Sequence, residues 1–389
     1  MPGRGIPLSQ HAHALVVAAL LSPATVVGQV APPDLDDGWA TAAPRDVGMD
    51  TDALARMTAS IAAGDYGNVH AVLIERGEQL VYEAYFPGPD ERRGVAVGQV
   101  EFDANQLHDL RSVSKSITSA LIGLAISRGD VASVDAPIGE LLPEYGRLLT
   151  GEKRSITLYH LLTMSSGLEW DESRPYWDSQ NDERRMDDSA DPIGFVLERG
   201  LLNEPGVIWN YSGGSTQVLA EVLEHATKQP LAEFAAEVLF EPLGIVQFEW
   251  LGDLAGTPSA ASGLRLRPRD LAKFGSVYLH GGRWNGVQVI SPTWVAASLT
   301  SQIENPDPSS PPFVTFEGYG YQWWVNTFQT AGGPLDLATA VGNGGQRIII
   351  VPGRQLAVTI LSGFYNDPGN FWTPERLLLE RILPAVDSL

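Results

Sequence analysis

Apolar residues recur at three- and four-residue spacing on either side of residue 117, and this spacing predicts a helix. Val113, Ile117, Ala120, Leu121 and Leu124 follow it, so we expect one helical face to lie in a core. Further segments with helical spacing are residues 50–62, 158–168, 215–225, 231–240, 267–279 and 374–383. The short helix at 158–168 is expected to stop at Gly167. The middle of the chain is therefore predicted to be mainly helical.

Strand-like runs lie near the two ends of the chain. Residues 69–75 and 79–86 flank a turn at Gly77, and residues 346–351 and 355–361 flank a second turn. Hairpins at both ends with helices between them predict an α/β (α+β) fold. In this fold both chain termini build one antiparallel sheet flanked by helices, and a helical lobe at roughly residues 115–280 is inserted in the middle.

The N-terminus carries a short apolar run over residues 14–21, preceded by Arg4 and followed by small residues before Gln29. This pattern resembles a secretory signal peptide over residues 1–28, and the run is too short to span a bilayer. The alternative is a disordered apolar leader. We expect a linker at 29–45, one domain at 46–389, and a periplasmic or secreted protein without stable membrane insertion after cleavage.

The net charge of the chain limits the classes of partner that it is expected to bind. With 47 acidic and 26 basic residues the formal net charge is −21, which argues against nucleic-acid binding and against docking on an anionic membrane. There are 0 cysteines, so disulfides, thiolate metal sites and a cysteine nucleophile are excluded. No residue cluster implies a cofactor or a metal, and His70, His108 and His160 are interpreted as structural. Oligomeric state is left open.

Ser112 and Lys115 form an S-x-x-K motif in the predicted helix. Residues three apart share a helical face, so the two side chains can touch. A lysine amine can take the serine proton if burial keeps the amine neutral, and the first helical turn offers free N–H groups to an oxyanion. Taken alone, the motif is more often a solvated helix pair than a catalytic site.

Two later segments fit a nucleophilic site. A loop at residues 205–214 presents Tyr211 to the space between the lobes, although a plain loop tyrosine is the alternative. Asn343, Gly344 and Gly345 precede a strand that starts near Gln346, where glycines let a substrate approach the backbone. Asn343 could instead cap the turn into that strand.

The S-V-S-K serine, the later Y-S-G and the G-N-G-G-Q strand occur in the order seen in one family. The chain resembles the superfamily of class C β-lactamases, penicillin-binding proteins and carboxylesterases over roughly residues 46–383. The resemblance implies a β-lactamase/transpeptidase-like fold. It implies that Ser112 is the acylated nucleophile, that Lys115 helps to remove its proton and that Tyr211 shuttles protons. The backbone N–H groups of Ser112 and Gln346 match the oxyanion hole.

The resemblance also implies one electrostatic property of the site, and the sequence departs from the family pattern at two positions. The Lys115 cation is expected to lower the pKa of Tyr211, because tyrosine ionises near pH 10 when unperturbed. The Y-x-N asparagine of the family is absent after Tyr211, and Asn343 replaces the lysine of K-T-G. Arg347 should point to the other face. A missing cation favours small-molecule ester or neutral amide substrates over β-lactams or D-Ala-D-Ala termini.

The residues around this motif set suggest where specificity lies. Four tryptophans are candidates for the substrate pocket, although tryptophan is usually a core residue: Trp170, Trp177, Trp323 and Trp324. The loop at residues 169–191 is long enough to be a lid or a binding wall. The leading hypothesis is a secreted serine hydrolase with an acyl-serine intermediate. The alternatives are a β-lactamase or D-Ala-D-Ala peptidase and, in another class, a non-catalytic ligand-binding protein on the same fold.

Overall fold

The computed structural model describes residues 30–253, 256–304, 314–330 and 332–387. The predicted signal peptide at residues 1–28 therefore lies outside the described residues. Across the described ranges, no helix combines the length and the apolar character needed to span a membrane.

The largest element is a seven-stranded antiparallel sheet with the order β10-β11-β12-β13-β14-β1-β2. Its N-terminal strands pair directly with the last strand of the chain, since Val72 of β1 lies opposite Ile360 of β14. The predicted sheet from both chain ends is thus confirmed. The strands are β1 Val69–Arg76, β2 Gln79–Tyr85, β10 Val314–Tyr319, β11 Trp324–Thr330, β12 Gly333–Gly342, β13 Gln346–Val351 and β14 Leu356–Ser362.

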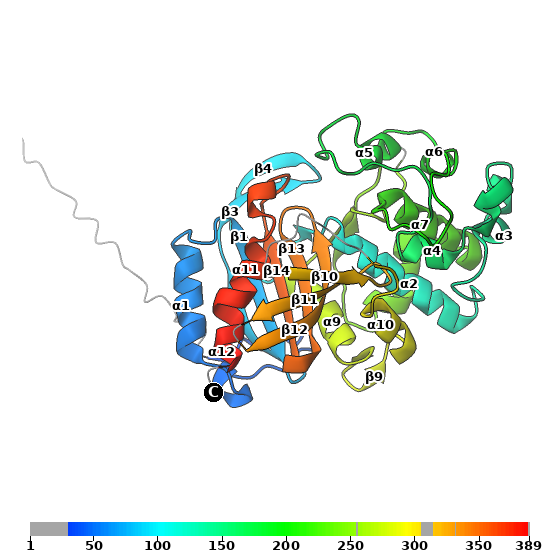
Figure 1. Ribbon diagram of the computed structural model, residues 1–389. Helices are drawn as coiled ribbons and strands as arrows, with labels where there is room; N and C mark the ends of the chain where they lie inside the picture. The colour runs from blue at the N-terminus through cyan, green and yellow to red at the C-terminus, as the bar shows by residue number, and fades with distance from the viewer. Residues whose placement is uncertain (1–29, 254–255, 305–313, 331, 388–389) are drawn as a thin grey trace, which may run out of the picture.

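The helices divide into those beside the sheet and those of a second lobe (Figure 1). The helices are α1 Thr51–Ala62, α2 Val113–Arg128, α3 Ile138–Leu141, α4 Leu158–Leu162, α5 Asp182–Asp187, α6 Pro192–Leu197, α7 Gly213–Thr227, α8 Leu231–Ala235, α9 Pro268–Leu279, α10 Pro292–Ser298, α11 Thr373–Leu377 and α12 Leu383–Asp387. A π-helical turn continues α8, and another joins α11 to α12. Helices α3 to α7 lie in a lobe inserted between the sheet strands β2 and β10, within the predicted helical region at roughly residues 115–280.

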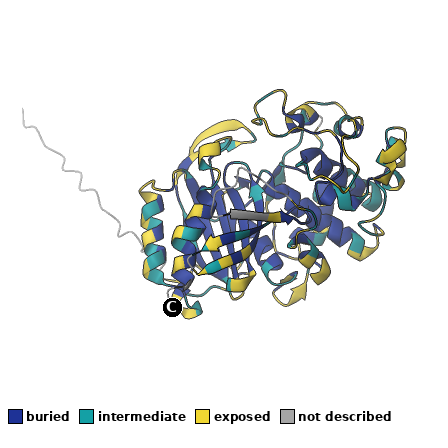
Figure 2. Ribbon diagram, viewed as in Figure 1, coloured by how far each residue is buried: buried dark blue, intermediate teal, exposed yellow. Residues whose placement is uncertain are grey.

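Both faces of the central sheet are covered, which explains the near-continuous apolar runs in its middle strands. Leu73 of β1 and Ile348 of β13 belong to the core shared with α2, α9 and the lobe. Val72 and Ile349, one residue away, belong to the core under α1 and α11–α12. Figure 2 shows these strands as buried and the outer surfaces as exposed.

Short strands outside the central sheet complete the architecture. A hairpin of β3 and β4 leaves the sheet after β2 and is largely exposed along β4 (Figure 2). β5 precedes α2 and pairs with β7, which pairs with β6. These strands are β3 Gly88–Arg92, β4 Val95–Val100, β5 His108–Asp109, β6 Phe248–Trp250, β7 Leu264–Leu266, β8 Arg283–Trp284 and β9 Val287–Gln288.

Two helices differ from the sequence prediction. Residues 113–125 of α2 are buried on every side rather than on one face. Hydroxyl groups on the helix are satisfied by backbone carbonyls, as where Ser116 Oγ donates to Gln322 O at 2.7 Å. The helix α4 ends at Leu162 and not at Gly167. Its end is held because the Gln322 side-chain amide donates to the carbonyls of Leu161 and Leu162.

Candidate active site

Ser112 stands at the N-terminal cap of α2 and is 7% exposed. The residue before it, Arg111, has φ 50, a left-handed conformation that costs a non-glycine residue about 1–3 kcal/mol. Its guanidinium lies 3.6 Å from carboxylate oxygens of both Glu91 and Asp109, and 4.7 Å from the ring centroid of Tyr365. These contacts hold the turn that presents the Ser112 hydroxyl to the cavity described below.

Lys115 lies one helical turn after Ser112 and is 1% exposed. Its Nζ donates to Ser112 Oγ at 3.1 Å, to the Ala261 carbonyl at 3.1 Å and to Glu183 Oε2 at 3.3 Å. The predicted contact between Ser112 and Lys115 is thus present. Glu183 belongs to α5, a helix within the segment that was predicted to be a loop.

Tyr211 completes the group from the loop before α7. Lys115 Nζ lies 5.0 Å from the Tyr211 ring centroid. The ring also stands 5.8 Å from that of Trp324 and 6.2 Å from that of Trp209, measured between centroids. The helix begins at the next residues, because Ser212 caps it by accepting from Ser215 N. The fold therefore brings Ser112, Lys115 and Tyr211 together.

Electrostatics in this group differ from the sequence expectation. Burial lowers the pKa of Lys115, but the negative charge of Glu183 and further acidic groups outweigh it, so this pKa lies above its ordinary value. Burial raises the pKa of Tyr211 more than the Lys115 cation lowers it, so the tyrosine pKa is also raised. The resting site therefore does not meet the condition of a neutral lysine, because Glu183 faces Lys115. The expected low pKa of Tyr211 is wrong, because burial outweighs the effect of the Lys115 cation.

A second carboxyl group, Glu172, lies beside Glu183. Burial and the Glu183 charge raise the pKa of Glu172 to about 8, while Lys115 opposes this shift. Burial raises the pKa of Glu183, but Lys115 and the hydrogen bond from Glu172 bring it below its ordinary value. At neutral pH the pair therefore holds one proton on Glu172 and one negative charge on Glu183, which faces Lys115.

The position of Glu172 is fixed by several donors. Trp170 Nε1 donates to Glu172 Oε2 at 2.6 Å, Tyr176 OH donates to Oε1 at 3.0 Å, and the Gly213 N–H also donates to Oε2. Glycine is required at position 213, because a Cβ there would collide with the Glu183 carboxylate. Both acids were missed from the sequence, although the density of acids and aromatics in residues 169–191 was visible.

The segment from Asn343 to Gly345 forms a tight turn between β12 and β13 instead of extending the strand. Gly344 and Gly345 have φ 96 and 87, values that favour glycine. Asn343 Nδ2 donates to Asn366 Oδ1 at 3.0 Å and Asn343 Oδ1 accepts from Asn366 N at 2.9 Å, so this side chain braces a neighbouring loop.

The strand after this turn starts with Gln346 and Arg347. Gln346 Nε2 donates to Ser362 O at 2.7 Å, and Oε1 accepts from Ser362 N at 3.1 Å, so the side chain is fixed between strands. Arg347 is fully buried in an ion pair with Glu375 at 2.5 Å. As expected from the sequence, Arg347 does not replace the missing cation.

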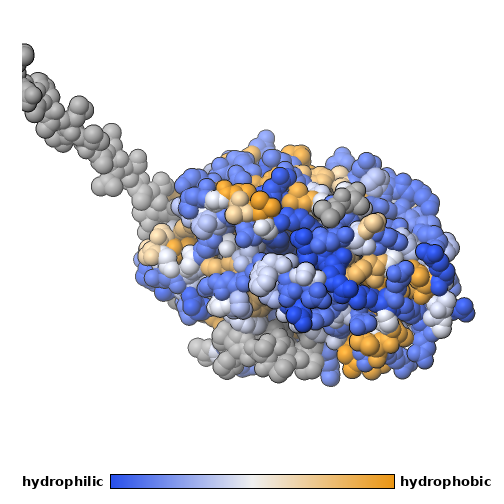
Figure 3. Space-filling model, turned by 90° about the horizontal axis from the view of Figure 1, so that it is seen from above, coloured by the Kyte–Doolittle hydropathy of each residue, from blue (hydrophilic) through white to orange (hydrophobic). Residues whose placement is uncertain are grey.

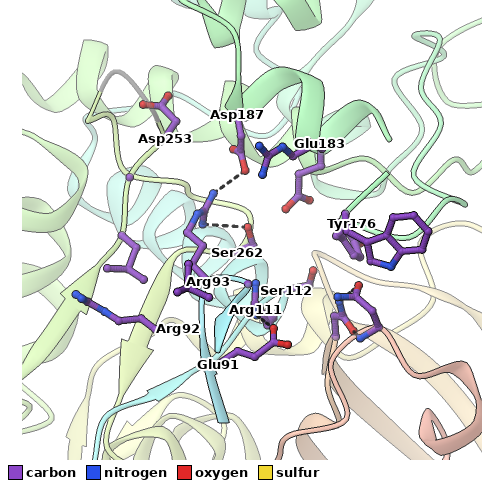
Figure 4. A pocket seen from close by; sticks show the side chains of 18 of the residues that line it. Glu91, Arg92, Arg93, Arg111, Ser112, Tyr176, Glu183, Asp187, Asp253 and Ser262 are labelled. Atoms are coloured by element: carbon purple, nitrogen blue, oxygen red, sulfur yellow. Dashed lines mark hydrogen bonds and ion pairs between the residues drawn. The ribbon is translucent and has the colours of Figure 1, made fainter. Parts of the chain in front are cut away.

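A cavity of about 870 Å³ opens at Ser112 (Figure 4). Its walls come from the β3–β4 hairpin, from the 169–191 segment and from the Asn343 turn, so that segment lines the cavity. Seen from above in Figure 3, the surface is mainly hydrophilic between separate hydrophobic patches. The lining includes Val95, Val97, Tyr176, Trp177, Leu251 and Asn366.

Each of the four arginines that line the cavity has a carboxylate partner. Arg93 Nη2 contacts Asp187 Oδ2 at 2.6 Å and so joins the hairpin to α5 (Figure 4). Arg92 pairs with Glu249 at 3.2 Å. Arg111 pairs with Glu91 and Asp109, and Arg184 pairs with Asp188. These partners reduce the capacity of the lining to bind a substrate carboxylate.

Two of the four tryptophans proposed for substrate binding, Trp170 and Trp323, lie outside the cavity lining. Trp323 is 0% exposed and its ring centroid lies 4.5 Å from that of Tyr278, so it is a core residue. Trp170 is 6% exposed and supports Glu172. Trp177 does line the cavity and is 74% exposed. The sequence around these tryptophans carries no pattern that distinguishes a core position from a position in the cavity lining.

Among the described residues, one cluster has side chains suited to a metal ion, and it consists of His70, Asp90 and His108. None of the three lines the cavity.

Comparison with known proteins places this arrangement in context. The profile of the Beta-lactamase family matches residues 25–373. Esterase EstB of Burkholderia gladioli is 35% identical over 153 residues, which span 36% of this chain and 37% of the esterase. The 6-aminohexanoate-dimer hydrolase of Paenarthrobacter ureafaciens is 26% identical over 318 residues, which span 78% of this chain and 74% of that enzyme.

The fold is shared with solved structures of low sequence identity. The class C β-lactamase from Rhodobacter sphaeroides is 19% identical and superposes with a TM-score of 0.60, covering 85% of this chain and 99% of that one. The sequence-predicted β-lactamase/transpeptidase-like fold is thereby confirmed. With a family profile that spans most of its length and a matching fold, the chain belongs to the β-lactamase family of hydrolases.

Proposed function

We propose that the protein is a secreted or periplasmic serine hydrolase that cleaves small esters or neutral amides through an acyl-serine intermediate. The observation that carries the proposal is the 3.1 Å contact between Lys115 Nζ and Ser112 Oγ at the helix terminus where the cavity opens. A serine at such a position combines a nearby proton acceptor with the positive end of a helix.

In the proposed acylation step, Ser112 Oγ attacks the carbonyl carbon of the substrate. The proton of Ser112 passes to the Lys115–Tyr211 pair and then to the departing alcohol or amine. The backbone N–H groups of Ser112 and Gln346 stabilise the oxyanion. Water, activated by the same pair, then attacks the acyl-serine ester and releases the acid.

The protonation state of the pair governs this step. Lys115 and Tyr211 both hold a proton in the resting site, because both pKa values are raised. The pair must lose one proton before it can accept that of Ser112, so the rate of acylation is expected to rise with pH.

The charge of the cavity supports an uncharged substrate. The arginines of the lining are paired with acids, and Asn343 is bonded to Asn366. A substrate carboxylate would have to compete with these partners. The relatives are named as an esterase and as a dimer hydrolase of 6-aminohexanoate, and these names are compatible with ester and amide bonds as targets.

The test is hydrolysis of p-nitrophenyl butyrate by the purified protein and two variants. Ser112→Ala should lose at least about 10³-fold in kcat. Ser116→Ala is a matched control, because it removes a buried hydroxyl of the same helix that bonds to Gln322 O. It should lose some stability and keep its turnover. A Ser112→Ala variant that turns over like wild type would overturn the proposal.

A fluorophosphonate probe tests whether Ser112 is a reactive nucleophile, independently of which substrate the protein prefers. It should add one label per chain to wild type and to Ser116→Ala, and none to Ser112→Ala, as read by intact mass. Labelling without ester turnover would keep the nucleophile and redirect the search to amides. Absence of both would favour the non-catalytic binding protein. A stable penicilloyl adduct on Ser112 would favour the penicillin-recognising alternative.

A further inference from the structure

Three residues from separate strands meet beneath the β3–β4 hairpin. His70 lies in β1, Asp90 in β3 and His108 in β5, and their exposed fractions are 0%, 5% and 0%. One nitrogen or oxygen from each lies within 4.8 Å of the others. They are buried and none of them lines the cavity, so they take no part in the proposed hydrolytic chemistry.

The outer nitrogen of each imidazole has a partner that can only accept a hydrogen bond. His70 Nε2 lies 3.0 Å from Asn68 Oδ1. The Asn68 amide is oriented by its Nδ2, which donates to Pro89 O at 2.8 Å, so its oxygen must face the histidine. His108 Nδ1 lies 3.0 Å from the Asp109 carbonyl. Both outer nitrogens therefore carry the ring proton of a neutral histidine.

It follows that the two inner nitrogens of the neutral rings are both lone-pair acceptors. His70 Nδ1 and His108 Nε2 nevertheless point at each other across 2.9 Å. Two acceptors at this distance repel unless a cation lies between them. The cation is either an additional proton or a metal ion.

An additional proton is disfavoured by the surroundings. His70 and His108 are both 0% exposed, and a charged imidazolium is costly in such a place unless it is directly paired and hydrogen-bonded. Asp90 Oδ1 lies 3.9 Å from His108 Nε2, too far for a hydrogen bond that would stabilise an imidazolium.

We propose that His70 Nδ1, His108 Nε2 and Asp90 Oδ1 bind a divalent transition-metal ion, with zinc as the preferred ion. Nitrogen and carboxylate donors of this kind suit zinc, and a hydrogen bond from the outer nitrogen to a carbonyl or amide oxygen is typical of metal-bound histidine. Two nitrogens bonded to one zinc at about 2.0–2.1 Å lie roughly 3.0–3.4 Å apart. The observed separation therefore needs to open by only a few tenths of an ångström.

The surroundings of the three donors are built to hold them in place. Tyr365 OH donates to Asp90 Oδ1 at 2.9 Å, and the Phe102 ring stacks on His70 with 4.1 Å between centroids. A Cβ at either Gly88 or Gly363 would collide with Asn68 and crowd His70. A metal here would fasten the base of the β3–β4 hairpin to β1 and β5, below the catalytic cavity.

The first experiment uses the untagged full chain. After exhaustive dialysis, elemental analysis should find about one zinc per chain. Chelator-treated protein should take up one Co²⁺ per chain and develop visible absorption bands, and its melting temperature should rise when zinc is restored. A wild-type protein that holds less than a tenth of a zinc per chain and takes up no Co²⁺ would overturn the proposal.

Variants locate the ion. His70→Gln, His108→Gln and Asp90→Asn should lose the stoichiometric Co²⁺ bands. His225→Gln is the control, because His225 is partly exposed and pairs with Glu144 away from this cluster. Loss of the bands in His225→Gln as well, or their survival in His108→Gln, would contradict the assignment. The wild-type Co²⁺ spectrum decides the matter even if a core variant does not fold.

Discussion

Lys115 Nζ and Glu183 Oε2 form an ion pair of 3.3 Å with side-chain exposures of 1% and 4%. The pair joins the helix that carries Ser112 to the segment that walls the cavity. A buried ion pair costs desolvation on both sides, so it is weak evidence for stability. Its consequence here is electrostatic, because it keeps a proton on the group next to the proposed nucleophile.

Removal of both carboxylates around Lys115 should shift the pH dependence of acylation. In Glu172→Gln/Glu183→Gln, burial is left as the dominant influence on Lys115, so its pKa falls. The midpoint of fluorophosphonate labelling against pH should move down by at least about one pH unit. Glu198→Gln, at an exposed position at the end of α6, serves as the control. An unchanged midpoint would argue against Lys115 as a proton acceptor.

Glu172 should make stability depend on pH. Its pKa is about 8 in the folded protein, raised by burial and by Glu183, against 4.5 for an unperturbed group. Between these values the folded state binds more protons than the unfolded state, so the free energy of unfolding falls as pH rises from 4.5 to 8. Glu172→Gln should flatten this slope in melting temperatures. Equal slopes in the two proteins would show that Glu172 is ionised at neutral pH.

Arg93 links the β3–β4 hairpin to α5 through Asp187. Arg93→Gln should loosen the cavity wall, raise KM several-fold and speed proteolytic cleavage of the hairpin. Arg92→Gln is the matched control, because its pair with Glu249 is about half exposed and contributes little. Burial raises the pKa of Asp187 to about 6 against the influence of Arg93. Wild-type KM should therefore rise below pH 6, and a KM that is flat from pH 5 to 8 would contradict this role.

Asn343→Lys should restore a cation to the turn before β13. A charge-assisted hydrogen bond to a substrate carboxylate is worth about 1.5–3 kcal/mol, so acylation by benzylpenicillin should accelerate by roughly 10- to 100-fold. Lysine cannot accept the hydrogen bond from Asn366 N, so the melting temperature should fall. Asn366→Ala breaks the Nδ2–Oδ1 contact between the two side chains without adding charge and controls for loop loosening. Acylation is followed by intact mass. Equal rates of acylation by benzylpenicillin in wild type and Asn343→Lys would contradict the argument that the missing cation favours neutral substrates.

Substitution of Trp323 should affect stability, whereas substitution of Trp177 should affect substrate binding. Trp323→Ala removes a fully buried ring and should cost about 3–5 kcal/mol of unfolding free energy. Trp177→Ala removes an exposed ring at the cavity and should change stability by less than about 0.5 kcal/mol while changing KM. Denaturant unfolding and ester kinetics on both variants test the pair. A reversed pattern would place Trp323 at the substrate.

Much of the fold could be predicted because its signals are local. The hairpin around Gly77 and the helix capped by Asp50 need only short-range patterns, and both are present. The full burial of α2 was hidden, because the hydroxyls of Ser116 and Ser119 find acceptors in carbonyls about 200 residues further along the chain.

The same limit applies to the functional groups. Ser112, Lys115 and Tyr211 lie in short motifs with a recognisable order. Glu172 and Glu183 lie in a segment rich in exposed acids, and only tertiary packing turns these two inward. His70 and His108 are 38 residues apart and meet only because the sheet and β5 bring them together.

The β3–β4 hairpin gives the chain a region where sequence can change at little cost. Val95 and Val97 line the cavity and are 68% and 51% exposed, so neither is needed by a core. Substitutions of Val95 and Val97 can alter which acyl or leaving groups fit the cavity without lowering the free energy of unfolding. Laboratory evolution toward new substrates should therefore gather its first tolerated mutations on this hairpin, well before it touches α2.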